Sequence, residues 1–296
     1  MADLPSFTEV DRYLLSNNDI PAEALAKLDT GKAPRSSYLS SDASKIQVFV
    51  LFGLDGVDSS DSVMLVALDR VHQKIKLISL ARDSYVFIPE FASFSKLAYS
   101  YTWGGAAMAV KNLNYNYYLN VSDYIAVDFD QLAQIIDRIG GVTVNIDEDE
   151  ARYLSNYPNV HVGDCLLDGE TAVSYARIRK SSATDSDRKR TGRQREVILS
   201  ILNTLQTMPL SQYPGFVRDC LGMCATSFEA ETLLTMAAET LGQNYTVEQY
   251  FFPEGQVDWW AGLIKEYFYY VYDLRRASDR IYRIIYEELY ISGYDD

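Results

Sequence analysis

Three strand-like runs follow one another between Lys45 and Asp83, and they constrain the fold more than any other feature of this chain. They read KIQVFVLFGLDG, DSVMLVALDR and KIKLISLARD, and all are rich in the aliphatic and β-branched residues that strands favour. An Asp-Gly turn ends the first run, and Val-His-Gln joins the second to the third. The runs therefore predict a β-meander laid into a central sheet.

Helical patterns follow the meander and place the chain in the α/β class. We expect a helix over 104–113 that begins at a glycine pair, and a short strand in SDYIAVDFD. A second helix, over 129–139, is closed by Gly140-Gly141. VTVNIDEDE reads as a strand that runs into an acidic loop, whereas periodicity does not decide between helix and strand for ETAVSYARIRK.

The C-terminal third is predicted to be mostly helical. Residues 190–205 form a strongly amphipathic pattern, and an apolar stripe at helical spacing runs through 261–290. Residues 1–44 read as a largely helical arm that ends in a Gly/Pro/Ser-rich connection. Strands mixed with crossing helices predict a three-layer α/β/α sandwich around a mixed central sheet.

Composition excludes several classes of protein. The chain has 296 residues, of which 48% are hydrophobic, enough for one large domain or two small ones. A net charge of −14 and a pI near 4.6 disfavour a nucleic-acid partner and a role in transcription. No apolar run is long enough to span a bilayer, and the first residues lack the pattern of a signal peptide. The chain is thus either cytosolic or a piece of an anchored protein.

The three cysteines leave the compartment open. Cys220 and Cys224 lie one turn apart if their segment is helical, which is a poor spacing for a mutual disulfide. Cys165 pairing with either remains possible, but three reduced thiols are the favoured interpretation.

A basic segment between Arg177 and Arg195 stands out in this acidic chain. It holds eight Lys/Arg and only two acids, Asp185 and Asp187. Arginine favours planar anions such as phosphate or carboxylate, because its guanidinium group binds them through two parallel hydrogen bonds. The alternative, a solvated basic face, is equally compatible with the segment. Arg177 and Arg179 would converge on one target in a strand and diverge in a helix.

Aspartates flank the turn between the first two strand-like runs. Asp55 follows the first run and Asp61 opens the second, an arrangement that can hold Mg²⁺ together with phosphate oxygens. Ordinary turn acids are the alternative. Arg82-Asp83 ends the third run and, taken alone, is more often a structural pair. His72 and His161 have no convincing metal-ligand neighbour in sequence, so any chemistry falls to arginine, aspartate and a cation, which suits phosphoryl transfer.

Four blocks, in order, resemble the catalytic domain of the LytR-CpsA-Psr family of bacterial cell-wall glycopolymer transferases. They are FGLDG with SDSVMLV, LISLARDSYVFIP, KLAYSYTWGG through DYIAVDFDQLAQIIDRIGGVTVNI, and LLDGETAVSYARIRK with DSDRKRTGRQREVI. The match is clear over 45–205 and extends over a domain of 45–290, with 206–290 as its helical C-terminal part.

The resemblance implies a fold, a reaction and a set of site residues. Family members have an α/β/α sandwich and transfer a polymer, such as teichoic acid or capsular polysaccharide, from a polyprenyl-pyrophosphate carrier to peptidoglycan. The acceptor is the C6 hydroxyl of N-acetylmuramic acid. An N-terminal membrane anchor, absent from this chain, would hold the domain on the extracellular face of the cytoplasmic membrane. Matched by position, the implied residues are Asp55 and Asp61 for Mg²⁺ (or Mn²⁺) and for the base, and Arg82, Arg177, Arg179, Arg190, Arg193 and Gln194 for the pyrophosphate.

Two other functions fit the same residues. A pyrophosphatase would give the phosphate bond to water instead of a sugar hydroxyl. A non-catalytic wall-polymer-binding protein would grip the anionic polymer without metal, and salt would weaken its grip.

Overall fold

The computed structural model describes residues 14–16, 19–28, 37–56, 59–179, 183–240, 245–253 and 257–293; for 183–187 and 210 it describes the backbone alone. Most of the predicted arm and its Gly/Pro/Ser-rich connection, Lys180, and the side chains of Asp185 and Asp187 lie outside these limits. The chain divides into two compact units. The first comprises 1–124 and 248–296, and the second comprises 125–247.

The fold is mixed α/β with a six-stranded sheet, which confirms the predicted class. The sheet has the order β10-β7-β2-β3-β4-β11. Its strands are β2 (Ile46–Leu54), β3 (Ser60–Asp69), β4 (Lys74–Leu80), β7 (Tyr124–Asp128), β10 (Ala225–Thr226) and β11 (Thr246–Phe252).

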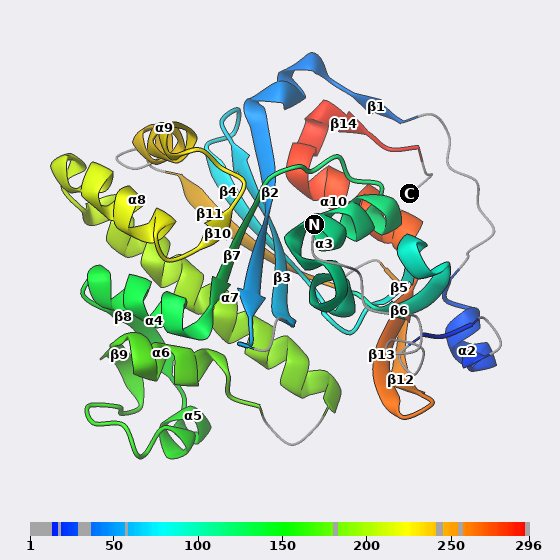
Figure 1. Ribbon diagram of the computed structural model, residues 1–296, viewed down its shortest axis with the longest axis horizontal. Helices are drawn as coiled ribbons and strands as arrows, with labels where there is room; N and C mark the ends of the chain where they lie inside the picture. The colour runs from blue at the N-terminus through cyan, green and yellow to red at the C-terminus, as the bar shows by residue number, and fades with distance from the viewer. Residues whose placement is uncertain are drawn as a thin grey trace. The chain divides into compact units, whose positions relative to one another are not determined.

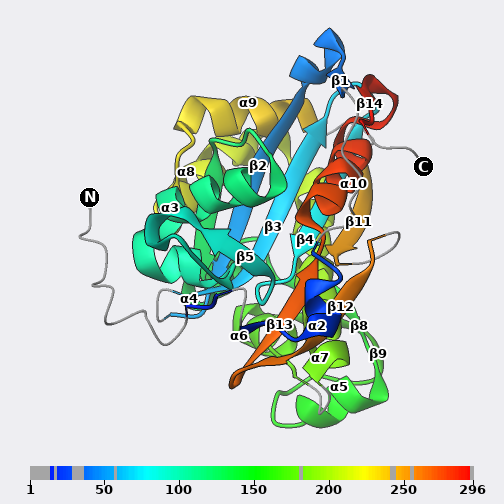
Figure 2. The same cartoon turned by 90° about the vertical axis from the view of Figure 1, so that its right-hand side faces the viewer.

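The predicted meander forms the centre of the first unit. β2 pairs antiparallel with β3, and β3 pairs antiparallel with β4 (Figure 2). Seven consecutive residues of β3, from Val63 to Asp69, are buried, because helices and strands cover the hairpin on both faces. Helix α10 (Leu274–Tyr286) contacts β3 and β4, and α3 (Tyr99–Tyr117) contacts β3 (Figure 1). The glycine pair that was expected to begin this helix lies inside it and kinks it, since Gly105 has a φ of 62° that favours glycine.

Short elements complete the first unit around the meander. They are α2 (Ala22–Leu25), β1 (Tyr38–Leu39), η3 (Ser41–Lys45), β5 (Tyr85–Ile88), η4 (Pro89–Phe91), β6 (Ser93–Lys96), β12 (Trp259–Ile264), β13 (Tyr267–Tyr272), η6 (Glu287–Leu289) and β14 (Tyr290–Ile291). α2 is the one α-helix of the arm within the described residues, and it packs on the β12–β13 hairpin. β14 pairs with β1, so the end of the described chain is bonded to the segment just before the sheet.

The second unit is built mainly from helices around one antiparallel hairpin. Its elements are α4 (Phe129–Arg138), β8 (Val142–Ile146), α5 (Glu148–Tyr153), β9 (Gly163–Leu167), α6 (Gly169–Ala176), α7 (Ala183–Thr207), η5 (Leu210–Gln212), α8 (Tyr213–Leu221), β10 and α9 (Ala230–Thr240). Leu154, Ile178 and Val197 belong to its buried core. Within it, α4 ends as predicted, with Gly140 and Gly141 both at positive φ.

Several sequence-based expectations for these elements are wrong. The C-terminal part is not mostly helical, because β11 and the β12–β13 hairpin occupy much of 246–272; their aromatic residues alternate faces at period two. The predicted acidic loop after β8 is helix α5, which starts with an Asp147–Glu150 capping box. For ETAVSYARIRK, which the sequence left open between helix and strand, the structure shows a helix up to Ala176. The helix expected from Arg190 begins earlier, at Ala183.

The three cysteines are free thiols, as favoured from the sequence. Cys165 is buried, and its thiol donates a hydrogen bond to the His161 carbonyl oxygen at 3.1 Å.

Candidate active site

A β-bulge places Asp61 next to the turn that joins β2 to β3. Gly53 is opposite Ser62 and Leu54 is opposite Ser60, which leaves Asp61 as the extra residue without a partner on β2. Such a bulge turns the side chain of the extra residue away from the regular alternation, and bulges are common next to active sites. The Asp61 carboxylate accepts a hydrogen bond from the guanidinium group of Arg82, which lies just beyond the end of β4.

Arg82 stands on a turn that backbone hydrogen bonds fix from three directions. The Ala98 amide donates to the Arg82 carbonyl oxygen, and the Tyr270 amide donates to that of Asp83. On the third side, the Ala81 amide donates to the carbonyl oxygen of Phe252 at 2.8 Å. A site residue held this way loses little conformational freedom when it binds a ligand.

A chain of buried hydroxyl groups supports the same turn from below. Ser84 donates to the Ala81 carbonyl oxygen at 2.7 Å, and its oxygen lies 2.8 Å from the Tyr272 hydroxyl. The Tyr272 hydroxyl lies 2.6 Å from that of Tyr117. Burial raises the pKa of the Tyr117 hydroxyl to about 12 and raises the pKa of Tyr272 well above its usual value, so both remain neutral hydrogen-bonding groups.

Charges of alternating sign run across this part of the first unit. Asp61 contacts Arg82, the Arg82 Nε lies 3.7 Å from the Asp83 carboxylate, and the Lys96 ammonium lies 2.7 Å from Asp83. The Lys96 ammonium also lies 5.5 Å from the centre of the Tyr269 ring. Arg82 keeps 21% of its side-chain surface exposed, so solvent or a ligand can reach it. The four side chains together have no net charge, so a bound anion would make the cluster negative.

Asp55 lies directly after β2, as predicted. Its amide donates to the Ser59 carbonyl oxygen at 3.1 Å, and its carboxylate accepts from the Ser59 amide at 3.3 Å. Asp55 and Asp61 therefore sit at the ends of β2 and β3 nearest the same turn. Oxygen donors of this kind fit Mg²⁺, which takes one or two protein carboxylates and completes its shell with water and phosphate oxygens. Metal binding by this pair stays a prediction.

In the second unit, Arg177 and Arg179 are both exposed and flank Ile178, which is fully buried. Arg177 is the C-cap residue directly after helix α6, so neither of the two arrangements weighed from the sequence describes the segment fully. The guanidinium carbon of Arg177 lies 4.5 Å from the centre of the Phe129 ring, which orients the group from one side. The pair is thus presented outward on a segment whose middle residue is anchored in the core.

Arg193 anchors that segment. Its Nε donates to the Glu150 carboxylate at 2.7 Å, and its Nη1 donates to the Ile178 carbonyl oxygen at 3.0 Å. The Arg193 and Glu150 side chains are 4% and 9% exposed. A buried pair of this kind needs both partners, because removing one leaves an uncompensated charge. The geometry shows Arg193 holding the backbone between the two exposed arginines; direct pyrophosphate binding by Arg193 stays a prediction.

Arg190 and Gln194 lie on α7 with Arg193, and spacings of three and four place Arg190 on the same face as both. Arg190 is 3% exposed, and the Gln194 side-chain oxygen is buried without a hydrogen-bond donor among the described residues. The buried oxygen is a polar group that a ligand could satisfy. The structure thus brings Asp61 together with Arg82 in the first unit, and Arg177, Arg179 and Arg193 together in the second. One site shared by both groups stays a prediction.

Sequence reasoning missed three residues of these surroundings. Glu150 lies 43 positions before Arg193 in sequence, and nothing local marks it as a partner. Phe129 and Tyr272 read only as apolar residues of their elements. Lys96 comes next to Asp83 because strand β6 folds back on β5, a pairing that the sequence does not mark.

No helix among the described residues is long and apolar enough to cross a membrane. The fold and the candidate site define a class of α/β proteins. Its members have two aspartates beside the turn between two strands and arginines that face outward.

The chain belongs to the LytR_cpsA_psr family, because residues 18–282 match the model of that family. It is 29% identical over 230 residues to the polyisoprenyl-teichoic acid–peptidoglycan teichoic acid transferase TagU of Oceanobacillus iheyensis, covering 74% of this chain and 69% of TagU. It is 30% identical over 184 residues to the regulatory protein MsrR of Staphylococcus aureus, covering 59% of this chain and 54% of MsrR.

Solved structures of similar fold include TagT of Bacillus subtilis. The TM-score is 0.67 at 19% identity, and the superposition covers 88% of this chain and 99% of TagT. TagT bound to LIIa-WTA gives a TM-score of 0.66 at 20% identity, covering 89% and 97% of the two chains. These likenesses confirm the fold expected from the four sequence blocks.

Proposed function

We propose that this chain is a phosphotransferase that moves an anionic glycopolymer from a polyprenyl-pyrophosphate carrier to peptidoglycan. Family membership and the name of the TagU relative support transfer of a wall polymer. The single observation that carries the proposal is the fixed turn that presents Arg82 to Asp61, the bulged residue of β3. The site of action would be the outer face of the cytoplasmic membrane, where a lipid-linked carrier and peptidoglycan meet.

The arginines would bind the pyrophosphate. The Arg82 side chain is partly exposed and Arg177 and Arg179 are exposed, and each guanidinium group is able to bind two phosphate oxygens at once. In phosphoryl transfer, the protein mainly positions the groups and neutralises the charge that spreads over the phosphate oxygens. Arg193 would act through the backbone at Ile178 and keep Arg177 and Arg179 in place.

The transfer itself would form one bond and break one. The C6 hydroxyl oxygen of N-acetylmuramic acid attacks the phosphorus that carries the glycopolymer, and the bond from that phosphorus to the bridging oxygen breaks. Polyprenyl phosphate leaves with the electron pair, and the hydroxyl proton passes to Asp61, which we favour over Asp55 as the base. Asp55 and Asp61 would hold Mg²⁺ (or Mn²⁺), which would neutralise charge on the two phosphates.

A transfer assay with a short polyprenyl-pyrophosphate saccharide and a soluble peptidoglycan fragment tests this proposal. Arg179→Ala should lower the rate by on the order of a thousandfold, as loss of an arginine finger does. Arg152→Ala is the matched control, because Arg152 is an exposed arginine of the same unit and pairs with Asp149 on the surface. The Arg152→Ala control should transfer at the wild-type rate. Chelation of divalent cations should stop transfer by the wild type and by this control.

Three results would replace the proposal with another. Full transfer by folded Arg179→Ala would remove the arginines from the mechanism. Release of free polymer without any acceptor would identify a pyrophosphatase. Binding that needs no metal, weakens with salt and leads to no turnover would identify a wall-polymer-binding protein.

A further inference from the structure

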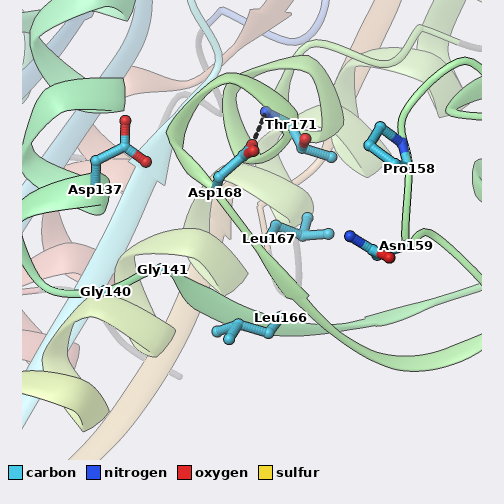
Figure 3. Close-up of a pocket in the computed structure, with 9 residues that line it drawn as sticks. All are labelled: Asp137, Gly140, Gly141, Pro158, Asn159, Leu166, Leu167, Asp168 and Thr171. Atoms are coloured by element: carbon cyan, nitrogen blue, oxygen red, sulfur yellow. Dashed lines mark hydrogen bonds between the residues drawn. The ribbon is translucent and has the colours of Figure 1, made fainter.

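A pocket of about 260 Å³ lies within the second unit, at one end of helices α4 and α6 (Figure 3). Asp137 and Gly140 line it from the end of α4, and Asp168 lines it from the start of α6. Asn159 and Leu166 line the opposite side. The volume is below the roughly 300–1,000 Å³ of pockets for drug-sized ligands, so a single small ring is the largest group it can enclose.

The pocket and the exposed arginines mark opposite ends of one packed helix pair. A Cβ on Gly169, at the start of α6, would lie 2.1 Å from the Ala133 carbonyl oxygen, so α4 and α6 touch backbone to backbone. At the other end, Arg177 after α6 stacks on Phe129, the first residue of α4. α6 has eight residues, and a helix of that length measures about 12 Å. A ligand in the pocket would therefore lie about one short helix away from a group bound at Arg177.

Polar groups in the pocket are positioned and still able to bind. One Asp137 oxygen accepts from the Gly169 amide at 2.7 Å, and no described residue donates to the other. Asp168 accepts from the Thr171 amide at 2.9 Å, and hydrogen bonds from Thr171 lower the pKa of Asp168, which stays a charged acceptor. The side-chain amide of Asn159 has no hydrogen-bond partner among the described residues. The pocket thus offers carboxylate acceptors facing an amide that both donates and accepts.

An aliphatic side chain and accessible backbone complete the lining of the pocket. Leu166 is 66% exposed although it is a large aliphatic residue, and its side chain lies across the pocket from Asp168 (Figure 3). Gly140 has a φ of 85° and no atom within 4 Å of the place a Cβ would take, so the backbone there is accessible. A sugar ring matches both surfaces, since its hydroxyl groups donate to carboxylates and its C–H face packs on aliphatic side chains. A bare cation would use only the carboxylates and gain nothing from Leu166.

We propose that this pocket is a carbohydrate subsite that binds one uncharged pyranose ring of a glycan chain. Its role in the reaction rests on the proposed function: a sugar held here would keep the glycan aligned with a phosphate at the arginines. Saccharide binding itself requires neither carrier nor turnover, so it can be measured separately.

Amide NMR of the whole chain, titrated with chitotetraose (a tetramer of N-acetylglucosamine), tests the subsite. The resonances of Gly140, Gly141 and Asn159 should shift with a common dissociation constant. Asp137→Asn keeps the acceptor for the Gly169 amide but replaces the unpaired oxygen, and it should weaken binding about tenfold, as loss of a hydrogen bond to a charged group does. Leu166→Ser should weaken binding severalfold. Val162→Ser, the matched control, changes an aliphatic residue that is 57% exposed and outside the lining, and it should bind like wild type.

Two results would overturn the subsite. One is the absence of shifts at these amides with millimolar saccharide. The other is a larger response of the same amides to Ca²⁺ or ethylammonium than to the saccharide, which would identify a cation site. Arg179→Ala separates this inference from the proposed function, because it should abolish transfer and leave saccharide binding unchanged. Saccharide binding without any transfer by the wild type would reject the function and keep the subsite, and transfer without saccharide binding would do the reverse.

Discussion

The two ends of the β3–β4 hairpin carry charged clusters of opposite character. At the Asp61 end, Arg82 pairs with a bulged aspartate and keeps 21% of its side chain exposed. At the Asp69 end, Lys76 is fully buried, and its ammonium lies 2.8 Å from Asp69, 2.8 Å from Glu287 and 2.9 Å from the Ile285 carbonyl oxygen. An ammonium group has three N–H donors, so three acceptors satisfy it completely.

The contacts of the two clusters indicate which of them is able to bind a ligand. Asp69, His72 and Glu287 place ligand atoms within 4.8 Å of one another, as a metal site would. The Lys76 ammonium already lies between two of these carboxylates and supplies the positive charge. A cluster neutralised and buried this way stabilises the fold. At the Asp61 end, Arg82 is partly exposed and stands on a turn, and a ligand can add charge there.

Among the variants, the loss of the partly exposed Arg82 should affect transfer most. Arg82→Ala should lower the transfer rate by on the order of a thousandfold, since the guanidinium group would be lost where phosphate charge develops. Arg82→Lys should recover only part of the rate, because an ammonium cannot bind two oxygens in a plane. The transfer assay of the proposed function measures both. A small effect on rate together with a large loss of stability would mean that the Asp61 end is structural like the Asp69 end.

The buried cluster should respond in the opposite way. Lys76→Met leaves Asp69 and Glu287 without their shared cation, and removing one partner of a buried ion pair costs about 3 kcal/mol. Urea unfolding should show this loss in the free energy of unfolding, while transfer per folded molecule stays near wild type. Lys45→Met is the control, because the Lys45 side chain is 62% exposed and pairs with Asp42 on the surface; its stability should hardly change. Equal stabilities of the two variants would refute the structural role of Lys76.

A smaller effect should come from the hydroxyl chain beneath the Arg82 turn. Tyr272→Phe removes the group that lies between Ser84 and Tyr117, and a buried hydroxyl left without its partner costs about 1–2 kcal/mol. Unfolding measurements check the loss of stability. Tyr282→Phe, which removes a hydroxyl bonded to the Tyr118 carbonyl oxygen nearer the surface, serves as the comparison. A Tyr272→Phe protein as stable as wild type would show that backbone hydrogen bonds alone hold the turn.

The sequence predicted what short-range patterns encode. The meander over 45–83 follows from period and turn residues, and the end of α4 follows from Gly140-Gly141. The sequence also predicted that three site residues, Asp55, Asp61 and Arg82, lie at strand ends. The reason is that each stands at or beside the end of a strand-like run, where side chains become accessible. The β12–β13 hairpin was missed because Leu263, Tyr267 and Val271 also fit a helical spacing, and cross-strand pairing alone decides between the two.

Pairings over long sequence distances could not be predicted. The charge of Lys76 has no local signal of burial, and its partner Glu287 lies more than two hundred residues away. The same holds for Arg193, which reads as one basic residue among eight but is held by Glu150 inside the core. The bulge at Asp61 depends on the register of two strands, which single-strand patterns leave open.

The weakest of the predicted effects is a pH dependence of stability, which should arise at the Asp69 end of the β3–β4 hairpin. The Asp69 end includes His72, whose Nδ1 lies 2.6 Å from Asp69 and whose Nε2 lies 2.8 Å from Glu288. Burial alone would lower the pKa of His72, but hydrogen bonds to Glu288 and Asp69 outweigh it and raise the pKa above its usual value. Charged groups facing this histidine are Asp69, Glu287 and Glu288, with Lys74 and Lys76 beyond them.

Since folding raises the pKa of His72, the protonated imidazole stabilises the folded protein. The stabilisation by protonated His72 is fully present below the pKa of an unfolded histidine, about 6.5. It is lost as the pH rises through the pKa of His72 in the folded protein. His72→Gln should therefore flatten the fall in unfolding free energy above that pH, relative to wild type. The chain has two histidines, so NMR titration with a His161→Gln variant assigns the raised pKa directly. A His72 pKa at or below that of an unfolded histidine would show that the ring is neutral in the cluster and that Lys76 alone neutralises the Asp69 end.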